Sequence, residues 1–136
     1  MNPYYNQNYT RDEIREILDK IKNCLSTGKF TISQNDKRQE NIDFINEYNI
    51  RSDKLKSILM RIKIEDFCHT LQNTNPGYEH EVLYVFVPQI KLFNAHGEAQ
   101  TVDVYTKFNI IEHATGSHTI VISFHKLNKP VNYLFR

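Results

Sequence analysis

The stretch QTVDVYTKFNIIE (residues 100–112) predicts a β-strand with one buried face, because its apolar side chains stand mainly at alternate positions. Four positions of one parity are expected to face the core: Val102, Val104, Phe108 and Ile110. Tyr105 and Lys107 then share the opposite face. Similar segments surround this stretch and are separated by turn residues, which predicts further strands at 68–72, 81–93 with a bend at Pro88, and 119–126, and a short edge segment at 132–135.

The N-terminal half has the spacing of apolar residues that is typical of helices. Thr10 and Glu13 form a capping-box pattern that opens a helix ending near Thr27. A β-prone stretch at 29–33 leads to a second helix that starts at about Asp36 and ends before Asn49, with Ile42, Ile45 and Tyr48 expected on its buried face. A third helix is expected from Ser52, its predicted cap, with Leu55, Ile58, Leu59 and Ile62 buried.

Helices followed by strands predict an α+β domain, in which the N-terminal helices pack on one face of a mostly antiparallel sheet. The length of 136 residues suits one domain, which we place at 10–136, after a flexible arm at 1–9. The N-terminus lacks the basic and apolar regions of a signal peptide, and no apolar stretch is long enough to span a bilayer. Together with the isolated Cys24 and Cys68, these features predict a cytoplasmic protein.

Composition and motifs also argue against several classes of function. A formal net charge of +1 argues against a broad nucleic-acid footprint, although a small RNA site is compatible with it. The six histidines show no spacing typical of a metal site, so no metal or other cofactor is expected. Neither a glycine-rich phosphate loop nor the sequence signature of a serine or cysteine nucleophile occurs.

Three short motifs suggest a family. DFCHTL (66–71), VYTKF (104–108) and IVISFH (120–125), together with the preceding helices and the segment Lys29-Phe30-Thr31-Ile32, resemble the motility quorum-sensing regulator (MqsR) family of bacterial toxins. The resemblance covers about residues 13–129. It implies a RelE-like fold, cleavage of messenger RNA without a metal, and silencing by a cognate protein antitoxin in a type II toxin–antitoxin module.

The resemblance also implies site residues. Tyr105 and Lys107 match the Tyr and Lys of the family's third strand, whereas His69 and His125 stand where the family has Lys. Glu81 falls near a family Gln, and Lys126 follows His125. We therefore expect His69, Tyr105, Lys107 and His125 to be catalytic, and Glu81 and Lys126 to contact the substrate.

The same residues are chemically suited to cleaving RNA. A metal-free reaction needs a base for the 2′-hydroxyl, cationic donors for the phosphorane and an acid for the leaving oxygen. His69 and His125 are the candidate acid and base, Lys107 the phosphate ligand, and Tyr105 a stacking face or hydroxyl donor. Near 1:1 pairing through the turn at Thr115-Gly116 would place His125 opposite Tyr105 and Lys107.

Two other interpretations remain open. Tyr and Lys side chains on one strand face are also ordinary in any half-solvated antiparallel sheet. The chain could instead be a phage or mobile-element regulator that acts by binding protein, without catalysis. Such a regulator is expected to expose an apolar patch around Tyr84, Phe86 or Tyr133.

Overall fold

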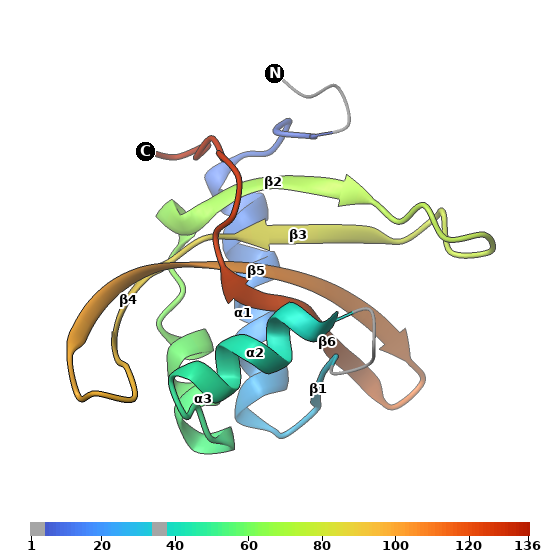
Figure 1. Ribbon diagram of the computed structural model, residues 1–136. Helices are drawn as coiled ribbons and strands as arrows, with labels where there is room; N and C mark the ends of the chain where they lie inside the picture. The colour runs from blue at the N-terminus through green and yellow to red at the C-terminus, as the bar shows by residue number, and fades with distance from the viewer. Residues whose placement is uncertain (1–4, 34–37) are drawn as a thin grey trace.

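The computed structural model describes residues 5–33 and 38–136, in which three α-helices precede most of the sheet (Figure 1). The helices are α1 (Arg11–Ser26), α2 (Gln39–Glu47) and α3 (Ser52–Met60), followed by a short 3₁₀ turn, η2 (Ile64–Asp66). The strands are β1 (Phe30–Ile32), β2 (Phe67–Gln72), β3 (Val82–Phe86), β4 (Gln89–Phe93), β5 (Ala99–His113) and β6 (Gly116–Lys126). The predicted α+β class is confirmed.

The sheet has the order β1-β6-β5-β3-β2, and β4 pairs with β5 outside this path. Only the β1–β6 pair is parallel among the paired strands of the described chain. The predicted bend at Pro88 divides one long segment into β3 and β4, and both halves pair with the 15-residue strand β5. Strand β5 therefore runs through the middle of the sheet, where it pairs with β3, β4 and β6.

One face of the sheet carries the main core. Apolar side chains from all three helices meet those of the strands, and Phe67, Phe86, Phe108 and Phe124 are fully buried there. The expected core residues of β5 are confirmed at Val102, Val104 and Phe108, with Ile110 partly buried. None of the helices in the described ranges has the length and apolar character needed to cross a membrane.

The opposite face of the sheet, which we call the second face, has a smaller apolar cluster. Val85, Val87 and Tyr105 are buried there together with Cys68. They are covered by the segment after β6, through Leu127, Val131 and Tyr133, and the Tyr133 hydroxyl donates to the Val87 carbonyl over 2.8 Å. Figure 1 shows this C-terminal segment crossing in front of the strands while α1 lies behind them.

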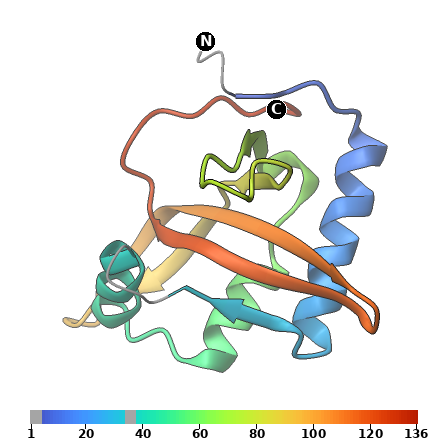
Figure 2. The same cartoon turned by 90° about the vertical axis from the view of Figure 1, so that its right-hand side faces the viewer.

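The N-terminal segment from residue 5 and the C-terminal segment lie side by side (Figure 2), and both bond to β2. Residues 1–4 of the predicted flexible arm lie outside the described residues, but Asn6 pairs with Thr70 through two backbone hydrogen bonds of 3.0 and 2.9 Å. The described part of the arm is thus attached to the sheet. The predicted edge strand at 132–135 is wrong: in this segment Leu134 donates one backbone bond to Phe67, and no ladder follows.

Two details of the predicted helices also differ. The expected start of α2 near Asp36 lies outside the described residues, and the buried face of α2 carries Asn41 and Phe44, whereas Ile42 and Ile45 are only partly buried. The N-cap of α3 is Arg51 and not Ser52. Leu55, Ile58 and Leu59 are confirmed as buried in α3, and Ile62 is buried just after it.

Replacing Thr10 with alanine is expected to lower the free energy of unfolding by about 1 kcal/mol. The Thr10 hydroxyl accepts from the Glu13 amide over 3.1 Å, and the Thr10 amide donates to the Glu13 carboxylate over 2.8 Å, so the change breaks a complete capping box. Urea denaturation measures the loss. Thr74→Ala in an exposed loop is the matched control, and an equal loss in both variants would contradict a capping role.

Candidate functional site

Strand pairing brings most of the predicted catalytic residues to the second face. His69 lies opposite Val85, Val85 opposite Lys107, and Lys107 opposite Ser123, so the four form one row across β2, β3, β5 and β6. Tyr105 lies opposite His125, which confirms the expected register of the β5–β6 hairpin. Lys107 and His125 are therefore diagonal neighbours, at a Cα separation of roughly 7–8 Å.

The ring of His125 is held by hydrogen bonding near the end of β6. Its Nδ1 lies 2.8 Å from the Lys126 carbonyl oxygen and 3.6 Å from a carboxylate oxygen of Glu40. Because a carbonyl oxygen can only accept, Nδ1 carries the proton, and in the neutral ring Nε2 is then the atom that can take up another. The arrangement is that of a general base whose second nitrogen is oriented by an acceptor.

Tyr105 packs directly against His125. The two rings are stacked, with centroids 5.3 Å apart and planes inclined by 19°. Tyr105 is only 5% exposed, and its burial, followed by the nearby Tyr5 hydroxyl, raises the pKa of the phenol to about 12. Tyr105 therefore keeps its proton at neutral pH, and it can position His125 or donate a hydrogen bond.

Lys107 lies at a groove of about 770 Å³ on the second face. Arg38, from the start of α2, lines the same groove, and the loop at 72–75 forms another part of its wall. Burial lowers the pKa of Lys107, and the charges of Arg38 and Lys129 lower it further. Cationic groups from two distant segments thus lie near Lys107, which gives up a proton more readily than an exposed lysine would.

His69 is separated from His125 by the two intervening strands β3 and β5. Three strand spacings of about 4.8 Å, combined with the offset of His125 by two residues along β6, place their Cα atoms roughly 16 Å apart. His69 is 2% exposed, and its pKa is lowered to about 4, first by burial and then by the charge of Lys129. The structure therefore does not bring His69 and His125 together as the expected acid–base pair, because three strand spacings separate β2 from β6.

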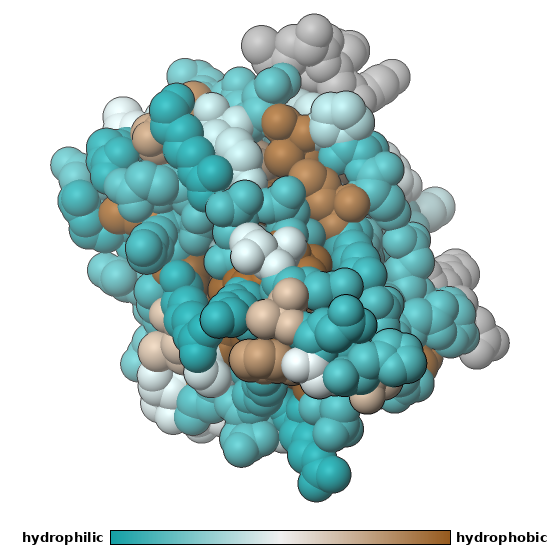
Figure 3. All heavy atoms as spheres, turned by 60° about the vertical axis from the view of Figure 1, so that its left-hand side comes forward, coloured by the Kyte–Doolittle hydropathy of each residue, from teal (hydrophilic) through white to brown (hydrophobic). Residues whose placement is uncertain are grey.

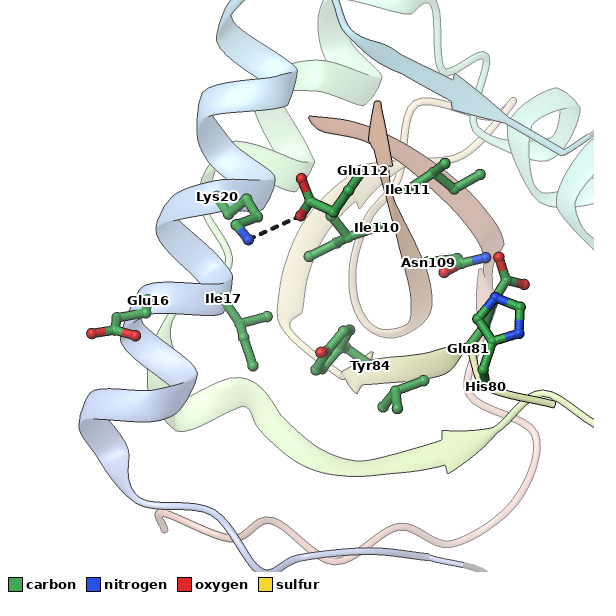
Figure 4. Close-up of a pocket in the computed structure, with 11 residues that line it drawn as sticks. Glu16, Ile17, Lys20, His80, Glu81, Tyr84, Asn109, Ile110, Ile111 and Glu112 are labelled. Atoms are coloured by element: carbon green, nitrogen blue, oxygen red, sulfur yellow. Dashed lines mark hydrogen bonds and ion pairs between the residues drawn. The ribbon is translucent and has the colours of Figure 1, made fainter. Parts of the chain in front are cut away.

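Glu81 and Lys126 do not lie with the other site residues. Glu81 lines a pocket of about 560 Å³ between α1, β3 and β5, on the helix-covered side of the sheet (Figure 4). The Asn73 side chain donates to its carboxylate over 3.0 Å. Lys126 is the next residue after His125, so its side chain points to the opposite, helix-covered side of the sheet. There it donates to Glu47 over 2.7 Å and lies over the Tyr48 ring. Both predicted substrate contacts are thus placed away from Lys107.

Three residues near the site come from segments that the sequence did not connect with it. Arg38 and Lys129 supply charge beside Lys107, and Glu40 approaches the His125 ring. Each is a solvated charge in a helix end or loop, and no short motif marks it. Only the pairing of β5 with β6 and the packing of α2 on β6 bring these charges to one face.

The aromatic patch expected of a protein-binding regulator is not assembled. Phe86 is fully buried, Tyr84 lies in the pocket beside α1, and Tyr133 bonds to Val87 on the second face. The side of the molecule in Figure 3 is largely hydrophilic, and its apolar atoms form small separate areas. Among the described residues, the large hydrophobic side chains that are exposed are Tyr78, Val82 and Phe93.

The chain matches no known family, none of the curated proteins and none of the solved structures with which it was compared. The resemblance to the motility quorum-sensing regulator family therefore depends on the short motifs named above. Within residues 5–33 and 38–136, no group of three His, Cys, Asp or Glu side chains is arranged to hold a metal ion.

Proposed function

We propose that this protein is a metal-independent endoribonuclease, the toxin of a type II toxin–antitoxin module, and that it cleaves messenger RNA at the groove around Lys107. The observation that carries the proposal is the cluster of His125, Tyr105 and Lys107, in which an oriented imidazole stands beside a partly buried lysine. The imidazole offers a proton acceptor and the ammonium a proton donor, and neither step needs a metal ion.

The chemistry follows from these positions. His125 Nε2 takes the proton of a ribose 2′-hydroxyl, and the 2′-oxygen attacks the adjacent phosphorus to form a phosphorane. Lys107 donates a proton to the departing 5′-oxygen as the P–O5′ bond breaks. Arg38 and Lys129 balance the charge that develops on the phosphate, and Tyr105 holds the His125 ring. The products are a 2′,3′-cyclic phosphate and a 5′-hydroxyl end.

The groove is suited to a few nucleotides of single-stranded RNA. Arg38 and Lys107 are the cationic side chains that line this groove, and the net charge of the chain is only +1, so a long duplex is a poor fit. Accessible single strands occur in messenger RNA, free or on the ribosome. In this proposal the enzyme acts in the cytoplasm, and a cognate protein antitoxin restrains it.

Incubation of the purified protein with a mixed-sequence RNA in EDTA tests the proposal. We expect cleavage that leaves 2′,3′-cyclic phosphate ends, and no cleavage of the same sequence made of DNA, which lacks the attacking 2′-hydroxyl. Addition of ribosomes shows whether they are required. If RNA stays intact with and without ribosomes, the ribonuclease proposal is wrong, and the non-catalytic regulator becomes the better explanation.

A further inference from the structure

The ring of His69 is covered by an aromatic side chain from the N-terminal segment. Tyr5 stacks on it with centroids 3.8 Å apart and planes inclined by only 4°. This is the closest and most parallel ring pair among the described residues. The geometry is that of a nucleobase stacked on an aromatic side chain in a complex with single-stranded RNA.

A small pocket of about 300 Å³ adjoins this stack. It is lined by His69, by Tyr5 and Gln7 from the N-terminal segment, and by the residues from Lys129 to Asn132. The Gln7 side chain donates to the Cys68 carbonyl over 2.8 Å and to the Asn132 carbonyl over 3.0 Å. The two chain ends are thus joined over His69, and they close it from solvent.

One nitrogen of the His69 ring lacks a hydrogen bond. This atom, Nε2, is buried and has no hydrogen-bond partner in the part of the chain that the structure describes. A histidine kept only for packing normally has its ring nitrogens satisfied, because burying an unpaired polar atom costs free energy. Stacking by Tyr5 covers the face of the ring and leaves this edge unused, whereas a nucleotide has ribose hydroxyls and phosphate oxygens to offer to it.

We propose that the His69 pocket is a nucleobase site and that Tyr5 occupies it as an internal plug. This inference rests on the proposed function, because it assigns the nucleotide neighbouring the one cleaved. His69 lies two strands from Lys107 in the same row, so RNA bound at Lys107 extends toward His69 across β3. Lys129 contributes positive charge to both positions. An RNA base enters by displacing the Tyr5 ring.

Chemical modification of the histidines tests the plug without any RNA. Diethyl pyrocarbonate acylates accessible neutral imidazoles, and trypsin releases His69 together with the exposed His80 on one peptide, 64–91. His80 is therefore an internal standard. We expect the modification of His69 relative to His80 to rise at least about tenfold in Tyr5→Ala and to stay at the wild-type level in Tyr5→Phe, which keeps the ring. Equal modification of His69 in all three proteins would overturn the proposal that Tyr5 shields it.

Binding of RNA tests the base site. The probe is a fluorescent 2′-O-methyl oligonucleotide of mixed sequence, which has no 2′-hydroxyl to attack. Loss of one competing stack is expected to tighten binding roughly 2- to 12-fold in Tyr5→Ala and not in Tyr5→Phe. The gain should vanish with an abasic oligonucleotide of the same length. Unchanged or weaker binding by Tyr5→Ala would overturn the base site.

The two proposals fail in different ways. If Tyr5→Ala binds the oligonucleotide more tightly but neither protein cleaves RNA, the base site stands and the ribonuclease proposal falls. If wild-type protein cleaves RNA while Tyr5→Ala binds no better, the enzyme stands and the base site falls.

Discussion

Alanine in place of Lys107 or His125 is expected to lower the rate of RNA cleavage by about 100-fold or more in each case. Lys107→Ala removes the proposed acid and the cation that Arg38 and Lys129 surround. His125→Ala removes the proposed base together with the ring on which Tyr105 stacks. The measurement is the single-turnover rate in EDTA with enzyme in excess, which separates the chemical step from product release.

Lys126→Ala is the matched control for both variants. It removes a positive charge from the residue next to His125, but that charge is bonded to Glu47 on the helix side of the sheet. Its cleavage rate is expected to stay within about threefold of wild type, since exposed ion pairs contribute little. A large loss in Lys126→Ala, or near-normal rates in Lys107→Ala and His125→Ala, would place the chemistry elsewhere.

Asn41→Ala is expected to lower the free energy of unfolding by roughly 3–5 kcal/mol. The fully buried Asn41 amide donates to the carbonyls of Ser33 and Ile122, each over 2.9 Å, and accepts from the Phe124 amide over 2.8 Å. Alanine leaves these three backbone groups buried without their partner. Guanidinium or urea denaturation monitored by circular dichroism measures the loss.

Asn46→Ala serves as the control for that change. It makes the same substitution in the same helix at an exposed position, where the effect is expected to stay within about 0.5 kcal/mol. Equal stabilities of the Asn41→Ala and Asn46→Ala variants would mean that Asn41 does not join α2 to the sheet as described.

Local patterns were sufficient to predict most of the elements. The capping box at Thr10 and Glu13 marked the start of α1, because its hydrogen bonds depend on residues only three positions apart. Alternation along β5 predicted that Tyr105 and Lys107 share a face, and a short turn predicted the pairing of Tyr105 with His125. Each of these features depends on neighbours in sequence or on one hairpin.

Features that depend on long-range packing were not predictable. Apolar periodicity pointed to Ile42 and Ile45, but α2 turns Asn41 inward, because the sheet edge at Ser33 and Ile122 offers backbone groups that need a partner. The separation of His69 from His125 follows from the insertion of β3 and β5 between their strands. That strand order cannot be read from motifs a few residues long.

The bridge that Gln7 forms over β2 also couples two segments that lie far apart in the sequence. The Gln7 side chain donates both to the Cys68 carbonyl in β2 and to the Asn132 carbonyl in the segment after β6. Release of either segment from the sheet breaks a hydrogen bond of this one side chain, so the two segments are expected to open as one cooperative unit. A local opening that frees the segment after β6 therefore loosens the N-terminal segment as well.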